Sequence, residues 1–158
     1  MASDGTKLIA ANRRAKRDYE LTETVEAGIV LQGSEVKSMR EAQVQITDGF
    51  VRFDGDEAWL QGIHIAPYAQ AQEHTGHDPD RLRKLLLHRR ELDRLRALMD
   101  QERVSIVPLR LYFRDGKVKV ELGVGKGRQK HDKRQAVAER DAKREVDREL
   151  AQRDKREV

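Results

Sequence analysis

The pattern of hydrophobic and polar residues is clearest over residues 117–124, where the two kinds alternate strictly. Four valines and leucines then share one side, which is the period-two pattern of a half-buried strand. A preceding strand is predicted over 104–114, and Asp115-Gly116 between the two favours a hairpin. Pro108 supplies no backbone donor, so it indicates a strand edge or a bulge in that preceding strand.

Residues 19–32 also follow a strand pattern, and Gly28 inside it indicates a bulge or a tight bend. A short helix is expected next, because Ser34 is a residue type that caps helix N-termini. Val36 and Met39 would be on its buried side.

The stretch from 43 to 68 predicts three short strands, since glycine turns at Gly49, Gly55 and Gly62 divide it. Many short strands with turn signals indicate a small barrel or sandwich. The residues expected to line its inner wall are Val44, Ile46, Phe50, Phe53, Trp59, Leu60, Ile63 and Ile65.

Residues 81–102 carry the one long helical pattern, with leucines recurring at spacings of three and four. The phase changes near His88, so either one kinked helix or two helices would fit. Residues 69–80 have no periodicity and predict a surface loop. His74 and His77 in that loop lack a further cluster of ligands, which argues against a metal site.

Charge divides the chain in two. Residues 1–124 hold 20 Lys or Arg and 20 Asp or Glu, whereas residues 125–158 hold 12 and 8. We therefore predict a folded domain over 1–124 and a basic tail over 125–158, disordered when free and helical on its partner. A basic tail points to nucleic acid. No stretch is apolar and long enough for a membrane, and a cytoplasmic location is expected.

The sequence supports a binding protein better than an enzyme. Gly-Val-Gly-Lys-Gly at 123–127 does not fit a phosphate-binding loop. Such a loop needs four residues between its first glycine and Gly-Lys-Ser/Thr, and here Gly127 is followed by Arg128. Ser34 and Lys37 have the spacing of some acyl-transfer enzymes but none of the partner motifs. Cysteine is absent. No catalytic residue, metal or cofactor is expected.

The amino-terminal residues 1–18 are polar and basic around Asn12, Arg13 and Arg14. Two interpretations are open at this point. The segment is either a solvated arm or an arm that contacts RNA phosphates.

Three stretches in this order resemble the bacterial SsrA-binding protein (small protein B) family: GIVLQGSEVKSMR, DRLRKLLLHRREL and KVELGVGKGRQKHDKR. The resemblance covers roughly residues 8–145. It implies a mainly β fold, a closed barrel related to the OB-fold with short packed helices. It also implies a monomeric, non-catalytic protein that binds the tRNA-like domain of transfer-messenger RNA. Alanyl-tRNA synthetase and elongation factor Tu would be partners through that RNA.

The same resemblance implies delivery of the RNA to stalled ribosomes, where the tail senses an empty message channel. Position by position, RNA contacts fall on Glu26, Leu86 and Lys119. The tail residues expected to contact the ribosome are Gly125, Lys126, Gly127, Arg128, Lys130, His131, Asp132, Lys133 and Arg134. Ala142 and the Glu149-Leu150 pair depart from residues found in some relatives.

A competing interpretation is a general OB-fold protein that binds single-stranded RNA or associates with ribosomes. Such proteins stack bases on exposed aromatic side chains. With 4% aromatic residues, this chain offers few of them.

Overall fold

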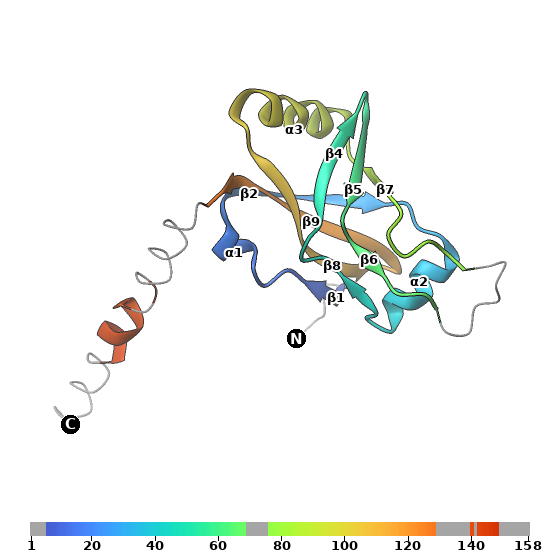
Figure 1. Cartoon of the computed structure of the whole chain (residues 1–158), viewed down its shortest axis with the longest axis horizontal. Helices are drawn as coiled ribbons and strands as arrows, with labels where there is room; N and C mark the ends of the chain where they lie inside the picture. The colour runs from blue at the N-terminus through green and yellow to red at the C-terminus, as the bar shows by residue number, and fades with distance from the viewer. Residues whose placement is uncertain (1–5, 69–75, 129–139, 141, 149–158) are drawn as a thin grey trace.

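The protein is mainly β, as its computed structural model shows for residues 6–68, 76–128, 140 and 142–148 (Figure 1). Strands dominate the part of the chain described before residue 129, and three helices accompany them. The strands are β1 (Thr6–Ala11), β2 (Tyr19–Ile29), β3 (Val44–Gln45), β4 (Phe50–Asp54), β5 (Glu57–Gln61), β6 (His64–Ile65), β7 (Arg83–Leu86), β8 (Ser105–Arg114) and β9 (Lys117–Gly127). The helices are α1 (Ala15–Asp18), α2 (Gly33–Arg40) and α3 (Arg89–Glu102).

Seven of the strands form one antiparallel sheet in the order β1-β8-β9-β2-β7-β5-β4, and β3 pairs with β6 separately. The sheet curls strongly, so that β4 at one edge packs near β8. Within the described residues it stays open, with β1 and β4 as its edges. In Figure 1, α3 and α2 lie at different ends of this curled sheet.

The alternation predicted for the last strand is confirmed. Val118, Val120, Leu122 and Val124 are all buried, whereas Lys117 is exposed. These four side chains pack with apolar residues from every other strand of the large sheet. The core therefore lies inside the curl of the sheet, where burial of apolar surface stabilises it.

Two of the three Asp-Gly hairpin turns are confirmed, whereas Asp48-Gly49 joins two strands that do not pair with each other. Asp115 and Gly116 connect β8 to β9 with φ values of 51° and 80°, the positive pair that a tight hairpin requires. Gly55 turns β4 into β5 with φ 58°. Pro108 marks a shift of register between β8 and β9, so the predicted bulge is present.

The segment 81–102 is not helical throughout, and here the prediction was wrong. Only α3 is a helix, and the residues before His88 form β7, which pairs with β2 and β5. Leu85 is buried in the sheet, whereas Leu82 and Leu86 face solvent. The leucines of this segment belong partly to β7 and partly to α3, and together they imitate the spacing of three and four of a single helix.

Several smaller predictions also need correction. Gly28 is paired on both sides, and the bulge of β2 lies between Leu21 and Glu23 instead. Gln32, rather than Ser34, caps α2, through a reciprocal pair of hydrogen bonds with Glu35. The 43–68 segment holds four strands, not three, and its Phe50 is 42% exposed rather than lining the inner wall.

The ends of the domain differ from expectation as well. The amino-terminal segment is not an arm, because β1 pairs with β8 and α1 follows it. The last strand runs to Gly127 instead of ending at Val124. Beyond it, residues 142–148 are helical; the predicted disorder of the tail otherwise concerns residues outside those described. Across the described residues, no helix is long and apolar enough to cross a membrane.

Candidate nucleic-acid interface

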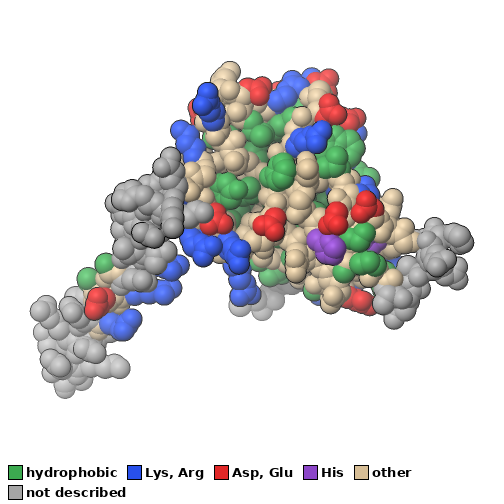
Figure 2. Space-filling view, in the orientation of Figure 1, with side chains coloured by type: hydrophobic (Ala, Val, Ile, Leu, Met, Phe, Trp, Pro, Cys, Tyr) green, Lys and Arg blue, Asp and Glu red, His purple; other side chains and the backbone are tan. Residues whose placement is uncertain are grey.

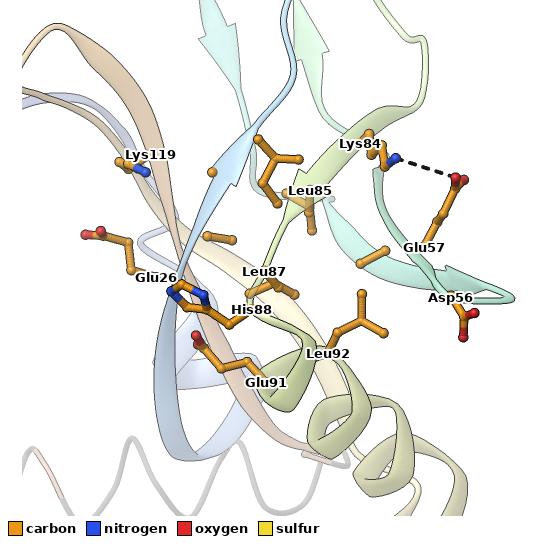
Figure 3. A pocket seen from close by; sticks show the side chains of 14 residues that line it. Glu26, Asp56, Glu57, Lys84, Leu85, Leu87, His88, Glu91, Leu92 and Lys119 are labelled. Carbon is orange, nitrogen blue, oxygen red and sulfur yellow. Dashed lines mark hydrogen bonds and ion pairs between the residues drawn. The ribbon is translucent and has the colours of Figure 1, made fainter.

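A hollow of about 700 Å³ opens where β2, β7 and β9 lie side by side and α3 begins (Figure 3). Three residues that were predicted to contact RNA line it together. Glu26 comes from β2, Leu86 from β7 and Lys119 from β9. Leu86 and Lys119 lie about 60 and 93 residues after Glu26 in the sequence, and the three meet at one surface.

Gly28 is the reason that Leu86 and Lys119 can share this surface. It pairs with Leu86 on one side and with Lys119 on the other, so the three residues form one row across the sheet. A Cβ atom at Gly28 would stand 3.2 Å from the Leu86 Cβ. Without a side chain in the middle of the row, Leu86 remains 54% exposed beside the hollow.

Charge in the hollow is mixed, and most of it is paired. Lys84 lies 3.5 Å from Glu57, and Asp56 receives hydrogen bonds from Arg96 and Arg89, which lower its pKa. The side chain of Lys119 makes no ion pair or hydrogen bond with the other described residues. It is therefore the lysine of the hollow whose ammonium is available to a ligand.

Glu26 is held from the side of β8. The Tyr112 hydroxyl donates to its Oε2, and Nη1 of Arg114 lies 2.6 Å from the same oxygen. Burial raises the pKa of Tyr112 to about 12, and the bond to Glu26 adds to that rise, so the hydroxyl stays a donor at neutral pH. Because β9 separates β8 from β2, this contact spans a whole strand.

Sequence reasoning missed one residue that lines the hollow and two residues beside it that contact Glu26. His88 precedes α3 and lies near Glu26 and Glu91 in Figure 3. In the sequence, the change in leucine phase at His88 indicates only a kink or a break in a helix. In the sequence Tyr112 and Arg114 show only a strand pattern, because their contact with Glu26 depends on the register of three strands.

The predicted amino-terminal residues lie elsewhere. Asn12 is buried, and its Nδ2 donates to the carbonyl of Pro108 at 3.2 Å while its Oδ1 accepts from the amide of Arg14. Its side chain thus fastens the end of β1 to β8. Arg13 and Arg14 are exposed, but they do not line the hollow.

The predicted tail residues fall into two groups. Gly125, Lys126 and Gly127 belong to β9 and pair with β2. A Cβ at Gly125 would stand 2.3 Å from the carbonyl oxygen of Glu20, so this glycine is needed for the close approach of the two strands. Arg128 donates its amide to the Asp18 carbonyl. The remaining residues, Lys130, His131, Asp132, Lys133 and Arg134, lie outside the described part of the chain.

A second charged cluster lies inside the fold. Glu35 on α2 and Arg83 on β7 are fully buried and form an ion pair at 2.6 Å, and Arg81 adds a second contact at 2.5 Å. Burial tends to raise the pKa of Glu35, but hydrogen bonds from Gln32, Arg81 and Arg83 outweigh it, and the pKa lies below its usual value. The cluster fixes β7, and hence Leu86, relative to α2.

The residues singled out for other chemistry have structural roles. Ser34 is hydrogen-bonded to Nδ1 of His77 at 2.8 Å, and Nε2 of His77 contacts the carbonyl of Ile65. With its second nitrogen on a backbone carbonyl, this histidine has no carboxylate to complete a catalytic triad. Among the described residues, no group of three potential metal ligands occurs.

The chain is similar to known proteins over nearly its whole length. The family model described as SmpB protein matches residues 9–152. The SsrA-binding protein of Oleidesulfovibrio alaskensis is 53% identical, covering 94% of this chain and 95% of that protein. The SsrA-binding protein of Mycolicibacterium smegmatis is 50% identical, covering 99% and 97%.

A solved structure is also similar to this chain. A chain from the work "tmRNA-SmpB: a journey to the center of the bacterial ribosome" matches with a TM-score of 0.65 and 45% identity. The match covers 81% of this chain and 93% of that one. With sequence and structure in agreement, the chain belongs to the SmpB family of SsrA-binding proteins.

Proposed function

We propose that this protein binds the tRNA-like domain of transfer-messenger RNA and delivers it to stalled ribosomes for trans-translation, which rescues the ribosome and tags the incomplete protein. Membership of the SmpB family supports this function. The observation that carries it is the meeting of Glu26, Leu86 and Lys119 in one hollow. These residues come from three strands that are far apart in the sequence.

The hollow has the mixture of groups that a folded RNA requires. Lys119 supplies an unpaired cation for a phosphate, and exposed Leu86 supplies an apolar surface for a base or ribose. Glu26 cannot neutralise a phosphate, so it accepts a hydrogen bond from a base or a 2′-hydroxyl. The curled sheet that carries them is a barrel related to the OB-fold, with β1 and β4 left as unpaired edges within the described residues.

The tail is the part that contacts the ribosome. Figure 1 shows the described helix of residues 142–148 outside the sheet domain. Residues 125–134 reach the decoding region and the following residues enter the empty message channel as a helix. Attachment of Gly125–Gly127 to β2 fixes the point from which this tail departs.

The remaining partners follow from the RNA. Alanyl-tRNA synthetase charges it and elongation factor Tu delivers it, so both meet this protein through the RNA rather than through a surface of their own. We place the protein in the bacterial cytoplasm as a monomer that acts by binding and has no catalytic residue.

Binding selectivity tests the proposal directly. The dissociation constant for the tRNA-like domain should be far lower than that for an unrelated RNA hairpin of equal length at the same salt concentration. Salt must be fixed because phosphate contacts make affinity depend steeply on it. Equal affinities would rule the proposed function out and favour a general RNA binder.

Truncation after Arg134 separates the domain from the distal tail. All described strands lie before this point, so the product should fold and bind the tRNA-like domain as the full chain does. It should fail to support tagging on ribosomes stalled on a truncated message. Loss of RNA binding in the truncated protein would show that the tail, and not the hollow, holds the RNA.

A further inference from the structure

Glu26 has one carboxylate oxygen in use and one that is free. The Tyr112 hydroxyl and the Arg114 guanidinium both contact Oε2. Oε1 has no hydrogen-bond or ion-pair partner among the described residues. The side chain is 34% exposed and lines the hollow with Lys119. Such an arrangement leaves an acceptor in place that the fold itself does not use.

Of the two donors, Tyr112 is rigidly placed. Tyr112 is only 5% exposed, and its ring lies between the guanidinium groups of Arg110 and Arg114, 5.4 Å and 5.6 Å from the ring centroid. A buried tyrosine has few rotamers available, and cation–π contacts on its ring restrict it further. Its hydroxyl therefore presents a fixed direction to Glu26 from across β9.

We infer that Tyr112 and Arg114 are positioning residues, which occupy Oε2 of Glu26 so that its Oε1 accepts a hydrogen bond from the RNA. This inference rests on the proposed function. The group that binds Oε1 must carry a proton to donate, which excludes a phosphate and leaves a base N–H or a ribose 2′-hydroxyl. Arg114 also compensates the negative charge of Glu26, so the carboxylate repels neighbouring phosphates less.

Glu26→Gln tests the direction of this hydrogen bond. A glutamine has one acceptor oxygen, and Tyr112 and Arg114, which only donate here, both require it. The amide nitrogen would then face the RNA donor, and two donors would meet. We expect the dissociation constant for the tRNA-like domain to rise about tenfold or more, with an unchanged midpoint of urea unfolding. Unchanged affinity would overturn the inference.

Tyr112→Phe tests the positioning role, because it removes only the hydroxyl and keeps the ring between the two arginines. We expect the dissociation constant to rise about threefold to tenfold in the wild-type background. In a Glu26→Ala background the same change should have no effect, since Tyr112 acts through Glu26. An equal loss in both backgrounds would show direct contact or general damage, and would contradict the inference.

Arg110→Gln is the matched control. Arg110 lies on the same strand, contacts the same ring and pairs with Glu121, but it does not touch Glu26. Its removal should leave the dissociation constant within about twofold of wild type. If Arg110→Gln and Arg114→Gln raise the dissociation constant equally, RNA binding depends on positive charge on β8 and not on the contact with Glu26.

Modified RNA identifies the donor. One set of tRNA-like domains carries single 2′-deoxy substitutions, and another carries inosine for guanine, which removes an amino donor. A third set carries single base analogues that remove the other base N–H donors. A substitution that makes wild type and Glu26→Gln bind equally well marks the group that meets Oε1. If no substitution in any of the three sets does so, the contact is absent and the inference fails. Wild-type protein that shows no preference for the tRNA-like domain would instead remove the proposed function, and the inference with it.

Discussion

Glu35 and Glu26 both contact arginine side chains, and they differ in how many of their carboxylate oxygens are used. Glu35 is fully buried; its Oε1 accepts from the Gln32 amide and from Arg81, and its Oε2 accepts from Arg83. Glu26 is exposed and has only Oε2 occupied. Both oxygens of Glu35 are thus satisfied within the fold, whereas Oε1 of Glu26 is left for the proposed contact with RNA. The comparison predicts large stability effects at Glu35 and binding effects at Glu26.

The largest effect is expected from Glu35→Ala. It would leave Arg83 fully buried without its carboxylate, and breaking a buried ion pair in this way costs about 3–5 kcal/mol. Urea unfolding followed by circular dichroism measures the loss. Glu26→Ala is the matched control and should change the free energy of unfolding by less than about 1 kcal/mol. Similar losses at the two positions would remove the distinction between them.

Two glycines of β9, Gly125 and Gly127, can be compared in the same way, because only one of them is closely packed. Gly125→Ala places a Cβ against the Glu20 carbonyl and should destabilise the protein by about 1–3 kcal/mol. Gly127→Ala meets only the Tyr19 ring at 3.9 Å and should cost less than about 1 kcal/mol. Thermal unfolding of the two variants would decide whether Gly125 belongs to the fold, and equal melting temperatures would argue that it does not.

The pH dependence of stability sharpens the role of Glu35. The pKa of Glu35 in the folded protein lies below its ordinary value of 4.5, so the folded state favours the ionised form. This contribution is complete above pH 4.5 and is lost as the pH falls through the folded-state pKa. We expect the free energy of unfolding to decline on acidification below about pH 5. Glu35→Gln should show a shallower decline, and an identical slope would mean that other groups cause it.

The smallest effect concerns the two lysines of the hollow. Lys119→Ala removes the unpaired ammonium and should weaken RNA binding about threefold to tenfold, with the salt slope reduced by about 1. Lys84 is already paired with Glu57, so Lys84→Ala should weaken binding less. Dissociation constants measured at several salt concentrations give both quantities. A larger loss at Lys84 would show that the RNA displaces Glu57.

Much of the sheet could be predicted from local pattern, but β7 could not. Strict alternation identified β9, and the Asp-Gly pairs identified two hairpins, because both signals are local. In β7 the inward-facing residues are Arg83 and Leu85, and a buried arginine reads as a polar position. Its partner Glu35 lies 48 residues earlier, so nothing near β7 in the sequence reveals that its charge is compensated.

The candidate site could likewise be predicted from the sequence only in part. That Lys119 points away from the core followed from the alternation of its strand, and the family resemblance supplied Glu26 and Leu86. Their meeting in one hollow could not be predicted while Leu86 was placed on a helix. The Tyr112 contact needs the register of β8, β9 and β2 together, which no local pattern contains.

The strand order also has a consequence for how the chain folds. Among the described residues β1 pairs only with β8, and β2 pairs along most of its length with β9. Most strand partners of residues 6–29 therefore lie at residues 105–127. Contacts between such distant segments make folding slow, on the order of milliseconds to seconds for small β domains. During synthesis, β1 and β2 emerge long before their partners and present unpaired edges until then. A ribosome that stalls before β8 is made would therefore hold a chain that cannot fold.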